Sequence, residues 1–96
     1  MNLDQLRAFK PQIRSLALLY KIDPDSIRVF GSVARGEASA NDVDLLVHPL
    51  QSCSLFDLGG FYEDVKELLH VPVDVVPDDS IRPLIKPYIE RDIVNL

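Results

Sequence analysis

The sequence predicts an α+β domain in which a small mixed β-sheet carries helices packed on one side. Two segments with helical periodicity come first, and three short apolar runs typical of strands follow at 27–31, 43–47 and 71–76. A long helical segment separates the last two runs. Only 11 residues, 32–42, join the first two runs, which is too short for a full crossover helix. The sheet is therefore expected to mix parallel and antiparallel neighbours.

The N-terminal segment predicts two short helices. Asn2 is placed to cap the first helix, over residues 2–9, and Gln5 stands where a capping box has Glu or Gln. Pro11 suits the first turn of the second helix, where a missing N–H costs nothing. Apolar residues then repeat at intervals of three, four and seven and predict one buried face: Ile13, Leu16, Ala17 and Tyr20.

The strands are delimited by turn residues. The turn residues DPDS at 23–26 precede the first strand, which ends at Gly31, and Pro49 closes the second strand. The tail carries Pro83 and Pro87. We expect short helical turns there, followed by an edge strand at 93–95.

The spacing of apolar residues predicts a helix over residues 54–70. One stripe is expected to face the core: Leu55, Leu58, Tyr62, Val65 and Leu69. Gly59 and Gly60 lie inside this segment, and each costs about 1 kcal/mol relative to Ala in a helix. We therefore expect a kink or a local loss of helix at the two glycines.

Composition and charge exclude several classes of protein. Ninety-six residues predict a single domain, 1–96, and the net charge of −5 argues against direct binding to nucleic acid. No apolar run approaches the roughly 18 residues of a membrane span, and the N-terminus lacks the pattern of a secretory signal. The lone Cys53 excludes an internal disulfide and a cysteine metal site. These features favour a cytoplasmic protein without a membrane partner.

Two of the strands carry carboxylates in an unusual pattern. Side chains alternate along a strand, so Asp42 and Asp44 share one face, with Cα atoms about 6.6 Å apart, while Val43 and Leu45 point to the core. Asp74 is likewise flanked by valines that point away from it. Three carboxylates can converge on an open face if the two strands are neighbours. A pair of aspartates alone is more often a solvated strand face, and it is the whole set that favours a site.

Carboxylates this close would repel one another without a cation. Oxygen ligands with no nearby His or Cys favour Mg²⁺ or Mn²⁺. Two such ions, about 3.5–4 Å apart, can stabilise the attacking and leaving oxygens of an in-line phosphoryl displacement. The sequence thus predicts a two-ion magnesium site at Asp42, Asp44 and Asp74.

A glycine–serine pair stands between the strands. Gly31 and Ser32 follow a strand and begin a short helical turn over 32–35, where free N–H groups can bind phosphate. Arg35 is the nearest cation and can reach phosphate oxygens. The plainer alternatives are an ordinary turn for the glycine–serine pair and a surface salt bridge for Arg35.

These residues together resemble a known family. GSVARG at 31–36, the Asp42-Val43-Asp44 triplet and a later strand bearing Asp74 are similar to the minimal nucleotidyltransferases of the DNA polymerase β superfamily. The resemblance runs nearly end to end and implies the polymerase β-like nucleotidyltransferase fold. Many relatives have Ser or Thr before the first aspartate, where this chain has Asn41, which can make a similar turn hydrogen bond.

The resemblance implies a function and a partner. Members of this family are usually antitoxins encoded beside a HEPN-domain ribonuclease toxin, and some transfer AMP from ATP to a tyrosine of that toxin. By resemblance, Asp42 and Asp44 hold the metal ions, and Asp74 completes one site and favours deprotonation of the attacking hydroxyl. Gly31 and Ser32 hold the nucleotide phosphates, and pyrophosphate leaves.

Two other functions stay open. The chain could be a non-catalytic antitoxin that neutralises its toxin by binding alone. It could also modify a small molecule, although such relatives usually have a second domain to hold the acceptor. The apolar tail either folds onto its own core or lies in a homo- or hetero-oligomer, and no motif indicates which base is preferred.

Overall fold

The computed structural model describes all 96 residues as one four-stranded sheet with five α-helices and a 3₁₀ turn. The elements, in chain order, are α1 (Leu3–Ala8), α2 (Lys10–Leu19), β1 (Arg28–Phe30), α3 (Gly31–Arg35), β2 (Val43–Val47), α4 (Leu55–Leu69), β3 (Val73–Pro77), the 3₁₀ turn η1 (Asp78–Ser80), α5 (Lys86–Asp92) and β4 (Val94–Asn95). The predicted order of helices and strands is confirmed, including the short helix and edge strand of the tail.

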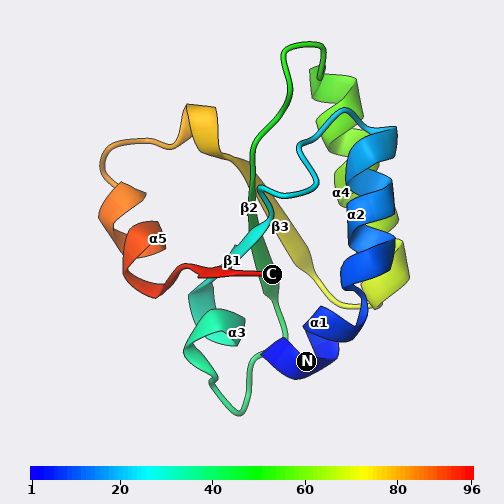
Figure 1. Cartoon of the computed structure of the whole chain (residues 1–96). Helices are drawn as coiled ribbons and strands as arrows, with labels where there is room; N and C mark the ends of the chain where they lie inside the picture. The colour runs from blue at the N-terminus through cyan, green and yellow to red at the C-terminus, as the bar shows by residue number, and fades with distance from the viewer.

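The sheet is mixed, as predicted. Its strand order is β3-β2-β1-β4, with β1 antiparallel to both β2 and β4. The pair β2–β3 is parallel and is connected through α4. The long helices α2 and α4 lie together on one side of the sheet, and the short helices α3 and α5 lie toward the other side (Figure 1).

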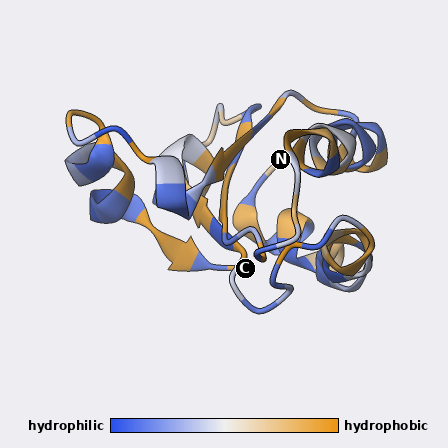
Figure 2. Ribbon diagram, turned by 90° about the horizontal axis from the view of Figure 1, so that it is seen from above, coloured by the Kyte–Doolittle hydropathy of each residue, from blue (hydrophilic) through white to orange (hydrophobic).

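The main core lies between the sheet and the two long helices. It combines strand residues such as Val29, Val43 and Leu45 with helix residues such as Ile13 and Phe61, all fully buried. In Figure 2 the strands in the middle of the molecule are largely hydrophobic, whereas the helices mix hydrophobic and hydrophilic residues. No helix is long and apolar enough to cross a bilayer.

The two N-terminal helices form as the sequence predicts. Asn2 caps α1 through a complete capping box with Gln5, with hydrogen bonds of 2.8 and 2.9 Å. Pro11 lies in the first turn of α2. The predicted buried face of α2 is confirmed at Ile13 and Ala17, while Leu16 and Tyr20 on the same face are partly buried.

The predicted core stripe of α4 is wrong in part. Val65 and Leu69 are buried as expected, but Leu55 is 85% exposed and Tyr62 is only half-buried. Phe61 fills the core instead. Because apolar residues occupy both 61 and 62, helical periodicity alone could not decide which of them faces the sheet.

The two glycines of α4 neither break nor shorten the helix, which is continuous from Leu55 to Leu69. Gly60 lies against the ring of Tyr20 on α2, and a Cβ there would overlap that ring. The Tyr20 hydroxyl donates a hydrogen bond to Asp64, one turn farther along α4. The expected loss of helix at Gly59 and Gly60 is therefore wrong, because the missing side chain at Gly60 lets two helices approach closely.

Candidate active site

The parallel pairing of β2 and β3 places two of the predicted carboxylates side by side. Asp44 and Asp74 are register partners in the ladder. Neighbouring strands lie about 4.8 Å apart, and register partners project to the same face. The requirement that these two strands be neighbours is thus met.

Asp44 lies on the opposite side of β2 from the main core. Val43 and Leu45, which flank it, are fully buried, whereas Asp44 itself is only partly buried. Leu46 projects to the same side as Asp44 and is nevertheless buried, as is Ile89 of α5, and both lie outside the main core cluster. Leu46 and Ile89 are therefore covered by residues other than those of the main core.

Asp42 lies just before β2 and is exposed. Its charge and that of Asp74 both raise the pKa of Asp44, after the larger effect of burial, and the Arg35 charge opposes them. Asp44 is therefore within electrostatic range of both other carboxylates. A cation near Asp44 would relieve this repulsion.

Gly31 brings the backbone of α3 directly against Asp44. Its φ of +74° lies in the left-handed region, and a Cβ on this residue would overlap the Asp44 carboxylate. The preceding residue, Phe30, is the register partner of Asp44 across β1 and β2. Glycine is thus needed here for two reasons, its backbone conformation and the close approach of the carboxylate. Ser32 follows in the first turn of α3 and is partly buried.

Arg35 ends α3 and makes two salt bridges. Its Nε donates to Glu37 and its Nη1 to Asp92 of α5, each at 2.9 Å. The surface salt bridge that was the plainer alternative for Arg35 is therefore present. Its contact with phosphate stays a prediction.

A comparison with known protein families settles the class of the chain. Residues 7–95 match the family described as "Nucleotidyltransferase domain". The chain belongs to this family. It is a nucleotidyltransferase, and the fold predicted from the glycine–serine pair and the spaced aspartates is the one that forms.

Curated relatives of this nucleotidyltransferase come from the archaeon Methanocaldococcus jannaschii. The present chain is 33% identical over 93 residues to "Putative protein adenylyltransferase MJ0126", and the match covers 95% of this chain and 90% of the relative. It is 31% identical to "Putative protein adenylyltransferase MJ0435", covering 100% of this chain and 99% of the relative. The similarity therefore spans whole chains.

Solved structures agree with the nucleotidyltransferase fold. One, described as "Structure of putative minimal nucleotidyltransferase", is 35% identical with a TM-score of 0.81, covering 100% of this chain and 97% of the other. Another, described as "Crystal structure of the toxin-antitoxin with AMP-PNP", has a TM-score of 0.71 at 19% identity, covering 90% of this chain and 70% of the other. At that identity, the second match supports the fold alone.

The aspartates of the nucleotidyltransferase do not form a ready-made metal cage. No three His, Cys, Asp or Glu side chains are drawn together closely enough to hold a metal ion by themselves. The donors still fit magnesium, because they are all carboxylate oxygens and because Asp42 and Asp74 raise the pKa of Asp44. Mg²⁺ in phosphoryl-transfer sites is usually bound by one or two carboxylates together with substrate phosphates rather than by an all-protein cage.

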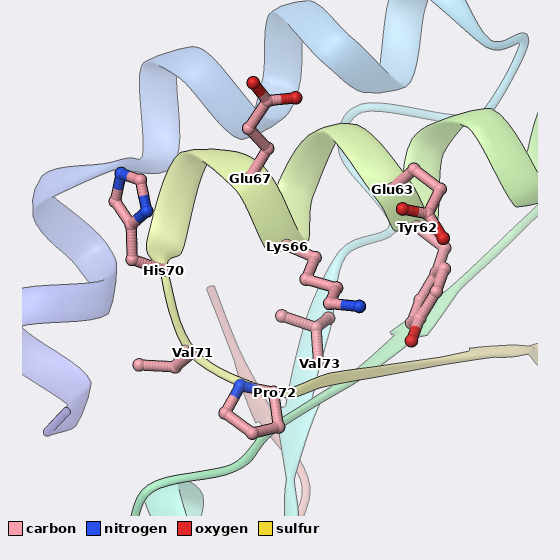
Figure 3. Close-up of a pocket in the computed structure, with 8 residues that line it drawn as sticks. All are labelled: Tyr62, Glu63, Lys66, Glu67, His70, Val71, Pro72 and Val73. Atoms are coloured by element: carbon pink, nitrogen blue, oxygen red, sulfur yellow. The ribbon is translucent and has the colours of Figure 1, made fainter.

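Of the three predicted catalytic aspartates, Asp42 and Asp74 are exposed and Asp44 is partly buried. A hollow of about 600 Å³ lies elsewhere, between the end of α4 and the start of β3 (Figure 3). Tyr62 and Lys66 line it, with the Lys66 ammonium 5.7 Å from the centre of the Tyr62 ring. Val73 also lines it, next in the chain to Asp74, but the two side chains project to opposite faces of β3.

Sequence reasoning missed Asp92 as a neighbour of the site. It lies in α5, 57 residues from Arg35, and only 13% of its side chain is exposed. No spacing rule connects residues so far apart in the chain. Helices α3 and α5 are in contact and lie toward the same side of the sheet (Figure 1), which brings the two residues together.

Proposed function

We propose that this nucleotidyltransferase is a Mg²⁺-dependent protein adenylyltransferase. It would transfer AMP from ATP to a hydroxyl, in particular a tyrosine of a cognate HEPN ribonuclease toxin, and so act as an antitoxin. The observation that carries the proposal is the pairing of Asp44 with Asp74 directly beside the Gly31 backbone. The names of the curated relatives support the same activity.

The proposed reaction forms one bond and breaks one. The acceptor hydroxyl oxygen attacks the α-phosphorus of ATP, the bond from that phosphorus to the oxygen bridging to the β-phosphate breaks, and pyrophosphate leaves. The hydroxyl proton passes to the carboxylate of Asp74. Asp42, Asp44 and Asp74 would hold Mg²⁺, which when bound supplies positive charge against the developing charge on the phosphates.

The other predicted residues bind the triphosphate. Gly31 allows the phosphate oxygens to approach the backbone N–H groups at the start of α3, and the Ser32 hydroxyl adds a donor. Arg35 lies on the same helix and has donors that its two salt bridges leave unused. The site would therefore bind the triphosphate along α3 and present its α-phosphorus to Asp44 and Asp74.

The test uses labelled ATP, Mg²⁺ and the protein encoded by the neighbouring gene. We expect the partner to gain the mass of one or more AMP groups in intact-mass spectra, and the combined Asp42→Asn and Asp44→Asn variant to abolish this gain. Asp25→Asn is a matched control, because Asp25 is an exposed carboxylate that pairs with Arg14. Labelling by the double variant would refute the proposal.

Neutralisation by binding alone is the second candidate. Large apolar side chains are exposed, among them Phe56 at 92%, Leu84 at 83% and Tyr88 at 67%, and they favour contact with a partner protein. The same experiment separates the two functions. If the double aspartate variant still neutralises the partner and the wild type adds no label, binding alone is the function.

A further inference from the structure

The Arg35 guanidinium is held on two sides by carboxylates from different parts of the chain. Glu37 comes from the turn that follows α3, and Asp92 comes from α5 near the C-terminus. These bonds use Nε and one N–H of Nη1. An arginine side chain has five N–H donors, so those of Nη2 are left for another ligand.

Arg35 lies on the same short helix as the residues predicted to bind phosphate. Residues three apart lie on the same face of a helix, so Arg35 shares a face with Ser32. The Gly31 backbone, in turn, lies against the Asp44 carboxylate.

From this geometry we infer that Asp92 is a positioning residue for nucleotide binding. It holds the Arg35 guanidinium at the end of α3 through Nη1, and Glu37 holds it through Nε, so that the remaining N–H groups can reach the triphosphate. This inference rests on the proposed function, because it assigns Arg35 to the nucleotide of that site. It gives α5 a part in nucleotide affinity, although α5 carries none of the residues predicted to bind phosphate or metal.

Two rival roles for Asp92 make different predictions. If Asp92 competes with the nucleotide for Arg35, removing its charge tightens nucleotide binding. If Asp92 only fastens α5 to α3, removing its charge lowers stability and leaves AMP-PNP binding by the folded protein unchanged. A positioning role instead requires that the effect of Asp92 on binding disappear when Arg35 is absent.

A double-mutant cycle distinguishes these roles. We would measure the dissociation constant of the ATP analogue AMP-PNP with Mg²⁺ by calorimetry for wild type, Asp92→Asn, Arg35→Gln and the double variant. We expect Arg35→Gln to weaken binding about twentyfold, as for the loss of a hydrogen bond to a charged group. Asp92→Asn should weaken binding about fivefold, because it releases Arg35 without removing it. The double variant should bind no more weakly than Arg35→Gln alone.

Matched variants control for charge and stability. Asp78→Asn makes the same change in charge and removes a similar bridge, from Asp78 to Arg28 at 2.8 Å. We expect it to lower the melting temperature and to leave AMP-PNP affinity unchanged. Asp92→Glu keeps the carboxylate and should restore most of the affinity lost in Asp92→Asn.

The outcomes separate this inference from the function on which it rests. Tighter binding by Asp92→Asn, or a further fivefold loss when Asp92→Asn is added to Arg35→Gln, would overturn the positioning role in a protein that still binds nucleotide. Failure of the wild type to bind AMP-PNP at all would refute the proposed function, and the positioning role with it.

Discussion

Strand β2 has only five residues, yet its two faces differ sharply. On one face, Val43, Leu45 and Val47 are fully buried in the main core. On the other, Asp44 is only partly buried and its pKa is raised by burial and by neighbouring carboxylates. One face thus stabilises the fold, while the other holds a charge that the fold disfavours. The same alternation recurs in β3, where Val73 is buried and Asp74 is exposed.

This contrast indicates how so small a domain holds a site. The core face anchors the strands, and their register fixes where the carboxylates lie without further support. If the division is correct, substitutions on one face should change stability with little effect on activity per folded molecule, and substitutions on the other should do the reverse.

The largest expected effect is on the carboxylate face, the side of β2 and β3 that carries Asp44 and Asp74. Asp44→Asn should reduce adenylyl transfer about a thousandfold, or about 4 kcal/mol in the barrier, because under the proposed function it removes a charge that holds Mg²⁺ at the reacting phosphate. Its melting temperature should rise slightly at pH 7, because the raised pKa of Asp44 means that folding disfavours its charged form. Rates of label transfer and thermal melts measure the two effects. A large loss of stability would contradict the division of roles.

The neighbouring residue tests the core face. Leu45 is fully buried, so Leu45→Ala should lower the free energy of unfolding by about 3 kcal/mol through lost contacts and a cavity. Transfer activity per folded molecule should not change at low temperature. Urea denaturation, with activity normalised to the folded fraction, measures both. A loss of activity comparable to that of Asp44→Asn would show that the two faces are not independent.

Gly31 contacts the Asp44 carboxylate, so one substitution there should lower both stability and transfer activity. Gly31→Ala should cost about 2 kcal/mol of stability, because alanine is strained at this φ and its Cβ overlaps Asp44. Transfer activity should fall because Asp44 is displaced. Gly36→Ala is a matched control: Gly36 has the same φ of +74°, but a Cβ there meets nothing within 4 Å. It should lose about 1 kcal/mol and keep its activity.

The smallest effect concerns the far end of the carboxylate face. His48 Nδ1 lies 2.9 Å from Asp78, and this hydrogen bond raises the pKa of His48 above its ordinary value. A histidine whose pKa is raised on folding contributes stability below its unfolded pKa of about 6.5 and loses it as pH rises through the folded pKa. The melting temperature should therefore fall slightly between about pH 6 and 8. Melts of His48→Gln, which should lack this component, provide the comparison.

Local patterns predicted most of the fold and the placement of two carboxylates of the candidate site. Alternation in β2 and β3 separated Asp44 and Asp74 from their buried neighbours, and the mixed sheet followed from the short connection between 31 and 43. These are properties of a few consecutive residues, which a sequence displays directly.

The errors came from contacts between distant segments. Helical periodicity allows either Tyr62 or Phe61 to face the core, and packing against the sheet selects Phe61. Helix propensity counts only the cost of Gly60 within its own helix, whereas the Tyr20 ring occupies the space that a side chain at Gly60 would fill. The Asp92 side chain meets Arg35 only because α5 returns to α3, and the sequence gives no sign of that return.

The length of the connection between α4 and β3 determines which face of the sheet Asp74 projects to. Only residues 70–72 separate the two elements, and His70 turns the chain there with a φ of +55°. Because side chains alternate with a period of two, deleting one of these residues would carry Asp74 into the apolar interior and expose Val73. A change in length that a surface loop would tolerate would here replace a carboxylate of the candidate site with a valine.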